Sequence, residues 1–434
     1  MTQTSSILLS LSIAMLAGLL LSRMVKKLQL PAVTAYLIAG ILIGPFVLGA
    51  IGVDGIGITG NQIHGLSIIS DVALGFIAFA MGNEFRLAHL KNIGKRATII
   101  GIFQAIFTTI TVDAFLIVLH LLMPDKLSLS AAIVLGAVAT ATAPAATLMV
   151  IKQYKAKGPL TEILLPVVAL DDAVGLVVFA ISFGIAKSLN TGSVDILSVI
   201  LEPLLEVVFS IILGTIMGLL FTFCEQFFHS RSKRMAVSVA FVMMTVALSL
   251  LKFEINGIHI SFSSLLACMM LGTIFCNECD VSEELMDRAD RWTAPILILF
   301  FVISGAELDL TVFADISVVI IGVVYILSRS VGKYFGAGIS ARATKCAPNI
   351  VKYLGITLLP QAGVALGMAG KAIELGADGA IVRNITLFAV LVYEIVGPYL
   401  TKLSLTKAGE IDPEGRKSAR DEHIAKKQVE ANAE

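Results

Sequence analysis

Two adjacent acids, Asp171 and Asp172, lie in the middle of the apolar stretch LPVVALDDAVGLVVF at residues 165–179. A charged Asp at the centre of a membrane-spanning helix costs about 2.5–3.5 kcal/mol on insertion scales, so acids at such positions usually serve a function. Because burial disfavours the charged form, such a carboxylate can take up and release a proton near neutral pH. A metal cation that arrives at the same oxygens displaces that proton. A site that holds either a proton or a cation is the minimum requirement of an exchanger.

The two carboxylates need different partners, because adjacent residues of a helix point about 100° apart. One carboxylate can face a cavity while the other pairs with a base on a neighbouring helix. Arg329 and Lys333 are the only basic residues that we place inside an apolar span. Their i, i+4 spacing puts them on one helical face. Either base is therefore a candidate charge partner.

Two further apolar stretches carry helix-breaking residues at membrane depth. The stretch GAVATATAPAATLMV at 136–150 contains Thr140, Thr142 and Pro144, and the stretch ITLLPQAGVALGMAG at 356–370 contains Pro360 and Gln361. Proline and glycine are common in transmembrane helices, but here they occupy corresponding places in the two halves of the chain. Unwound backbone is tolerated in a membrane where it lines a cavity, and its carbonyls then face cations. We expect two broken helices that cross beside the acidic pair.

The composition is that of an all-α polytopic membrane protein. Of 434 residues, 57% are apolar and 15% are charged, with a mean hydropathy of +0.90. The formal net charge of +0 gives no sign of a nucleic-acid partner. Apolar runs of about 20 residues predict thirteen transmembrane helices, at residues 5–23, 31–50, 65–84, 97–123, 129–150, 160–186, 194–223, 235–251, 258–276, 293–307, 312–338, 350–373 and 379–401.

Basic residues are distributed unequally between the two sets of loops. If the N-terminus is outside, 25 of the 32 Lys and Arg residues fall in cytoplasmic segments and five in outer loops. Positive charge is retained on the cytoplasmic side of inner-membrane proteins. We therefore expect a multi-pass protein of the cell inner (plasma) membrane with its N-terminus outside and its C-terminus in the cytoplasm.

An internal repeat is visible in the sequence. FIAFAMGNEFRL at 76–87 matches LFFVISGAELDL at 299–310 at a shift of 223 residues, and DDAVG at 171–175 matches YEIVG at 393–397 at a shift of 222. The shift spans seven helices, so the second copy is inverted in the membrane, as in secondary transporters. This symmetry makes Glu394 the counterpart of Asp172. We expect a first repeat at 1–186, a linker helix at 187–232, a second repeat at 233–404 and a cytoplasmic tail at 405–434.

The chain resembles the monovalent cation:proton antiporter superfamily, in the branch of two-aspartate bacterial sodium/proton antiporters and Kef-type transporters. The resemblance rests on AGILIGPFVLG at 39–49, FAMGNEFRL at 79–87, FFVISGAELDL at 300–310 and the Asp-Asp pair. It implies two inverted six-helix repeats with crossing broken helices. It also implies that Asp172 binds the cation and the proton. The same resemblance makes Asp171 the residue that pairs with a base on the helix at 312–338.

For that base we expect Arg329 first and Lys333 second. Thr142, in the crossing segment, completes the expected ion site, and Glu84 is a further candidate acid. The chain departs from relatives at two positions. Ala143 stands where related eukaryotic-type exchangers carry an Asp, and Gln361 lies in the span where several relatives carry an acidic residue. It also has no nucleotide-binding domain after the last span, which argues against Kef-type gating.

We therefore expect an antiporter, and no enzyme or bound cofactor, that exchanges Na⁺ for H⁺ by alternating access. Spans 3–6 and 10–13 should form the transporting core, and spans 1, 2, 8 and 9 a scaffold, which the resemblance implies mediates a homodimer. Exchange of K⁺ for H⁺ and another sodium-coupled substrate on the same fold are the alternatives. An intramembrane hydrolase would need its two acids on different helices, and a cation sensor would not need symmetric broken helices.

Overall fold

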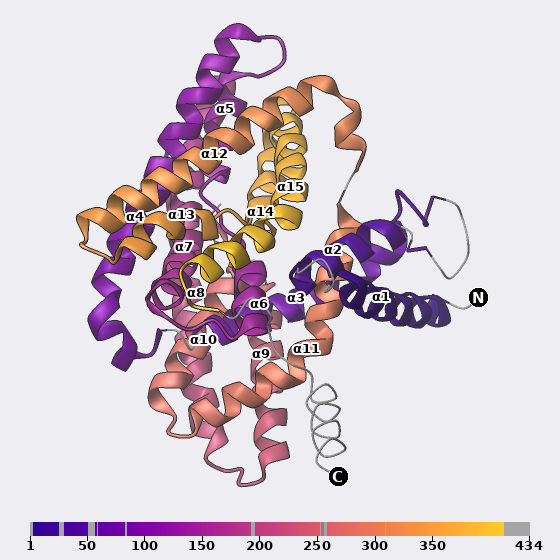
Figure 1. The fold of residues 1–434 in the computed structure, drawn as a ribbon, viewed down its shortest axis with the longest axis vertical. Helices are drawn as coiled ribbons and strands as arrows, with labels where there is room; N and C mark the ends of the chain where they lie inside the picture. The colour runs from indigo at the N-terminus through magenta and orange to yellow at the C-terminus, as the bar shows by residue number, and fades with distance from the viewer. Residues whose placement is uncertain are drawn as a thin grey trace, which may run out of the picture.

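The computed structural model describes residues 3–25, 30–50, 57–58, 60–82, 85–191, 196–251, 253–255, 258–308 and 310–411 (Figure 1). These residues form fifteen α-helices and one short hairpin, β1 (Phe253–Ile255) with β2 (Ile258–Ile260). The helices are α1 (Gln3–Val25), α2 (Ala32–Ile43), α3 (Gly60–Gly82), α4 (Leu87–Leu122), α5 (Leu129–Val138), α6 (Pro144–Tyr154), α7 (Pro159–Thr191), α8 (Ile196–Glu225), α9 (Arg231–Ser249), α10 (Ser264–Glu278), α11 (Ser282–Glu307), α12 (Ile316–Ala343), α13 (Pro348–Thr357), α14 (Gly363–Ala372) and α15 (Ala377–Lys407).

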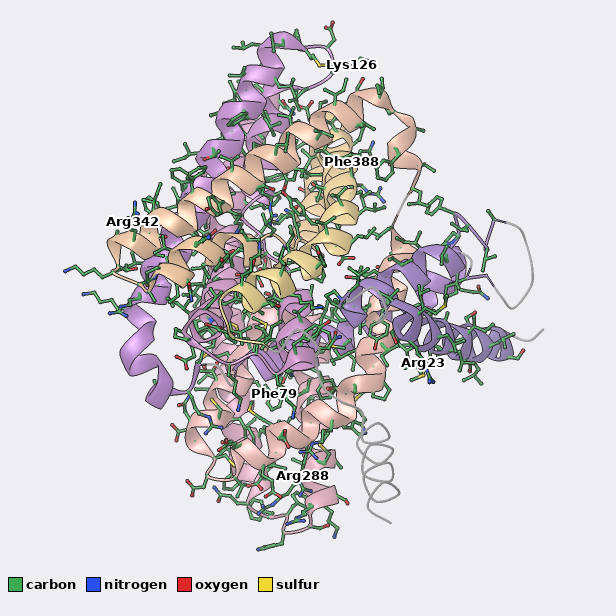
Figure 2. All side chains as sticks on the ribbon, viewed as in Figure 1. Arg23, Phe79, Lys126, Arg288, Arg342 and Phe388 are labelled. Carbon is green, nitrogen blue, oxygen red and sulfur yellow. The ribbon has the colours of Figure 1, made fainter. Side chains whose placement is uncertain are left out.

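The expected all-helical membrane architecture is confirmed. Eight helices among the described residues are long and apolar enough to cross a membrane, and shorter apolar helices accompany them. Each of the thirteen expected spans overlaps a helix, and the spans at 129–150 and 350–373 are each broken into two short helices. The labelled cations Arg23, Lys126, Arg288 and Arg342 lie towards the edges of the molecule, whereas Phe79 lies within it (Figure 2).

The helices pack in two groups. In the first group, α4 packs against α12 and α7, α5 packs against α7, and α12 packs against α13 and α15. In the second group, α10 packs against α3 and α8, and α11 packs against α1, α2 and α3. The two groups occupy different parts of the molecule (Figure 1). We call them the core group (α4–α7 and α12–α15) and the scaffold group (α1–α3 and α8–α11).

One expectation about this division is wrong. The spans at 65–84 and 293–307, expected in the core, are α3 and α11, and both pack within the scaffold group. Glycines explain the pairing, because they let helix backbones approach closely. A Cβ atom at Gly40 would lie 2.0 Å from the Val302 carbonyl oxygen, and one at Gly272 would lie 2.2 Å from that of Phe79. Gly40 thus seats α2 on α11, and Gly272 seats α10 on α3.

Glu410, just after α15, fixes the start of the helix that carries the two aspartates. Its carboxylate accepts hydrogen bonds from the backbone N–H groups of Leu160 (2.6 Å) and Thr161 (2.8 Å), and from the Thr161 hydroxyl (2.6 Å). The first amides of a helix have no partner within the helix, and a negative charge near them is favourable. The end of α15 therefore anchors the N-terminus of α7.

Candidate functional site

The aspartate pair lies halfway along α7, and both side chains are buried. Asp171 is 0% exposed and Asp172 is 1% exposed. The surrounding helix is apolar, so neither carboxylate reaches water along α7 itself. Because buried charges are costly unless they are paired, the partners of each carboxylate indicate what it does.

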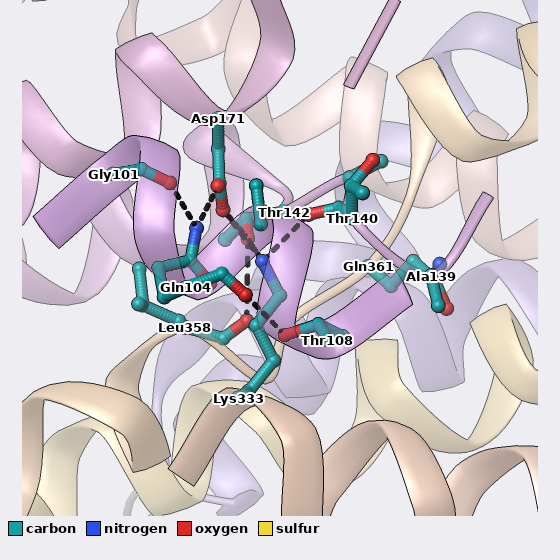
Figure 3. Close-up of polar contacts among 12 residues, drawn as sticks. Gly101, Gln104, Thr108, Ala139, Thr140, Thr142, Asp171, Lys333, Leu358 and Gln361 are labelled. Carbon is teal, nitrogen blue, oxygen red and sulfur yellow. Dashed lines mark hydrogen bonds and ion pairs between the residues drawn. The ribbon is translucent and has the colours of Figure 1, made fainter. Parts of the chain in front are cut away.

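Asp171 is fully engaged by protein groups (Figure 3). Its Oδ2 atom forms an ion pair with the Lys333 Nζ atom at 2.6 Å and accepts a hydrogen bond from the Thr142 hydroxyl, also at 2.6 Å. Its Oδ1 atom accepts a hydrogen bond from the Gln104 side-chain amide. Lys333 is itself buried, and its ammonium also donates to the Thr140 carbonyl oxygen at 2.6 Å. Asp171 thus neutralises the buried ammonium group of Lys333.

The expectation that Arg329 is the first choice of partner for Asp171 is wrong, since Lys333 forms the ion pair. Arg329 instead donates to three backbone carbonyls, those of Ala139 (2.9 Å), Leu359 (2.7 Å) and Ala141 (2.7 Å). The planar guanidinium suits this task, because its donors point in several fixed directions. Arg329 satisfies carbonyls that helix breakage leaves without partners.

The two unwound segments, 139–143 and 358–362, meet at this point. The backbone N–H of Ala143 donates to the carbonyl oxygen of Pro360 at 2.8 Å. Gln361 donates from its side chain to the Val138 carbonyl oxygen at 3.0 Å and to the Tyr325 hydroxyl at 2.9 Å. The expected crossing of two broken helices is confirmed. Pro144 begins α6 at a position where its missing N–H costs nothing, and α14 begins after Pro360.

Asp172 differs from its neighbour because neither of its carboxylate oxygens has a hydrogen-bond partner among the described residues. The side chain lines a cavity of about 370 Å³. The walls come from both helix groups, with Ala143, Met368 and Glu394 on the core side and Glu206, Ser263 and Phe301 on the scaffold side. A buried, unpartnered carboxylate at such a boundary can bind a proton or a small cation from the cavity.

The structure brings most of the predicted site residues together. Asp171, Lys333, Thr142 and Thr140 form one hydrogen-bonded network, while Arg329, Pro360 and Gln361 hold the crossing. Glu394 lines the same cavity as Asp172. Glu84 lies outside the described residues.

Two members of the site were missed in the sequence. Gln104, on α4, is fully buried and binds Asp171, and Tyr325, on α12, is fully buried and binds Gln361. A lone amide within the apolar span at 97–123 was a usable signal for Gln104, since polar residues inside a membrane span usually have a partner there. Nothing in the sequence distinguished Tyr325 from an ordinary core aromatic residue.

Comparison with known proteins covers most of the chain. The sequence model of the transmembrane sodium/hydrogen exchanger family matches residues 11–407. The Na⁺/H⁺ antiporter NhaS4 of Synechocystis is 23% identical over 407 residues, which cover 92% of this chain and 96% of the relative. A Na⁺/H⁺ antiporter of Enterococcus hirae is 22% identical over 397 residues, covering 88% of this chain and 94% of the relative.

The fold also matches a solved structure. The sodium proton antiporter MjNhaP1 from Methanocaldococcus jannaschii, at pH 8, superimposes with a TM-score of 0.65. The match covers 93% of this chain and 96% of the other at 19% identity, and it shows that the two proteins share a fold.

Proposed function

We infer that the chain, which belongs to the sodium/hydrogen exchanger family, exchanges sodium for protons across a membrane. One observation carries this inference at the level of residues. Asp172 is buried, lines the cavity between the core and scaffold groups, and has no hydrogen-bond partner for either carboxylate oxygen among the described residues. A proton and a sodium ion would compete for these oxygens, and this competition couples the two fluxes.

The neighbouring residues are proposed to keep the site in shape. The Asp171–Lys333 ion pair and Thr142 fix the unwound segment 139–143 next to Asp172. Arg329 joins that segment to the other one through the Leu359 carbonyl. With the crossing held in this way, the core group can move as a body against the scaffold group and expose Asp172 to each side in turn.

The finer assignments are proposals of the same kind. We propose that the protein lies in the cell inner (plasma) membrane with its N-terminus outside and its C-terminus in the cytoplasm, as the distribution of Lys and Arg favours. We also propose a homodimer formed through the scaffold group. The repeat boundaries are proposed at residues 186 and 233.

Flux measurements on purified protein in proteoliposomes test the proposed function. An outward-directed gradient of sodium should acidify the compartment that loses sodium, and liposomes without protein provide the baseline. We expect sodium to support faster exchange than potassium. Exchange that is faster with potassium would assign the protein to K⁺/H⁺ antiport, and an absence of cation-dependent proton flux would contradict antiport altogether.

A further inference from the structure

A second acid, Glu394 on α15, lines the same cavity as Asp172. Its side chain is 4% exposed, and its Oε2 atom has no hydrogen-bond partner among the described residues. Glu206 also lines the cavity, but its carboxylate accepts a hydrogen bond from the Ser261 hydroxyl at 3.0 Å. Among the described residues, Asp172 and Glu394 are therefore the two buried acids of the cavity that have an oxygen without a hydrogen-bond partner.

The two acids occupy equivalent positions in the inverted repeats. Gly175 follows Asp172 by three residues, and Gly397 follows Glu394 by three residues. A Cβ atom at Gly175 would lie 2.6 Å from the Thr140 hydroxyl oxygen, and one at Gly397 would lie 2.9 Å from the Pro360 Cγ atom. Each acid thus lies about one turn before a glycine that packs on the broken helix of its own repeat.

The residue just before each acid contacts a buried base of α12. Asp171 pairs with Lys333, and the ring of Tyr393 lies under the guanidinium of Arg329, with 4.5 Å between the ring centroid and the Arg329 Cζ atom. The two buried bases of α12 thus engage one residue from each repeat. The next residue in each repeat, Asp172 or Glu394, lines the cavity instead.

We propose that Glu394 is a second carboxylate ligand of the transported cation, so that each inverted repeat contributes one acid to the site. This inference rests on the proposed function. Carboxylate oxygens are the preferred ligands of hard cations. A cation bound between the repeats would also hold them at a defined separation, which links occupancy of the site to the packing of both halves of the core.

The Glu394→Gln variant tests this assignment in proteoliposomes, because the amide keeps the size of the side chain and removes its charge. We expect the KM for sodium to rise about tenfold, as for the loss of one charged ligand. The kcat should stay close to that of the wild type. The Glu394→Asp variant keeps the charge and should restore part of the affinity.

Glu307→Gln is the matched control. Glu307 lies at the end of α11 and is not among the residues that line the cavity. A KM close to that of the wild type in this control would show that loss of an acid outside the cavity does not by itself change sodium affinity.

A wild-type KM in Glu394→Gln, or a lower kcat at an unchanged KM, would overturn the ligand role. If Glu394→Gln does not fold, a wild-type KM in Glu394→Asp would overturn it, because moving a ligand by one methylene must weaken the site. These outcomes are distinct from failure of the proposed function, in which the wild-type protein itself would show no exchange.

Discussion

Replacing Asp172 by Asn should reduce exchange to the background of vesicles without the protein, while the variant stays folded. The amide matches the carboxylate in size, so the packing of α7 is kept. The amide neither takes up nor releases a proton in the relevant pH range, and it has no charge to hold a cation. Proton binding and sodium binding at this position are therefore both lost. Because the Asp172 oxygens have no protein partner among the described residues, the substitution breaks no hydrogen bond there. Sodium-driven pH change in everted vesicles measures the effect.

The Asp113→Asn variant is the matched control for that result. Asp113 is another acid within a spanning helix, and its Oδ1 atom is buried without a partner among the described residues, but it packs against Gly136 and does not line the cavity. We expect this variant to retain exchange. Exchange near the wild-type level in Asp172→Asn would show that another residue carries the ion.

Breaking the Asp171–Lys333 pair should destabilise the protein more than removing the pair. Asp171→Asn leaves a buried lysine without its counter-ion, and Lys333→Met leaves a buried carboxylate without one. Loss of one partner of a buried pair costs about 3–5 kcal/mol, whereas removal of both is milder. Thermal unfolding in detergent should therefore give a Tm for the double variant above that of either single variant.

The Asp171→Asn variant combined with Arg342→Ala provides the control for this cycle. Arg342 is an exposed cation at the end of α12, the helix that carries Lys333. The change in stability caused by Arg342→Ala should add to the change caused by Asp171→Asn without any interaction between them. Additive losses for Asp171 and Lys333 would mean that the two side chains do not interact in the folded protein.

Local signals explain why so much of the fold could be predicted from the sequence. The spans are set by runs of apolar residues long enough to cross a bilayer. The two breaks are indicated by Pro144 and Pro360, which fall in corresponding spans of the two repeats. The acid pair was conspicuous because its surroundings are apolar. Each of these features depends on residues close together in the chain.

Contacts between distant helices could not be predicted in the same way. Choosing between Arg329 and Lys333 required the rotation of α12 relative to α7, and both bases lie on the same helical face. The guanidinium of Arg329 donates hydrogen bonds to carbonyl oxygens of two segments that are more than 200 residues apart in the sequence. Similarly, the place of α3 and α11 in the scaffold group depends on close contacts at Gly272 and Gly40, whose partners lie on other helices.

The central claim is that the Asp172 carboxylate holds either a proton or a sodium ion, and never both. The KM for sodium of the wild-type protein in proteoliposomes, measured across a series of pH values, tests it most directly. Competition at one carboxylate predicts that the KM rises by up to about tenfold for each unit of falling pH in the acidic limb, because each bound sodium must displace one proton. Saturating sodium should then restore the rate. A KM for sodium that stays constant as the pH falls would contradict the shared site.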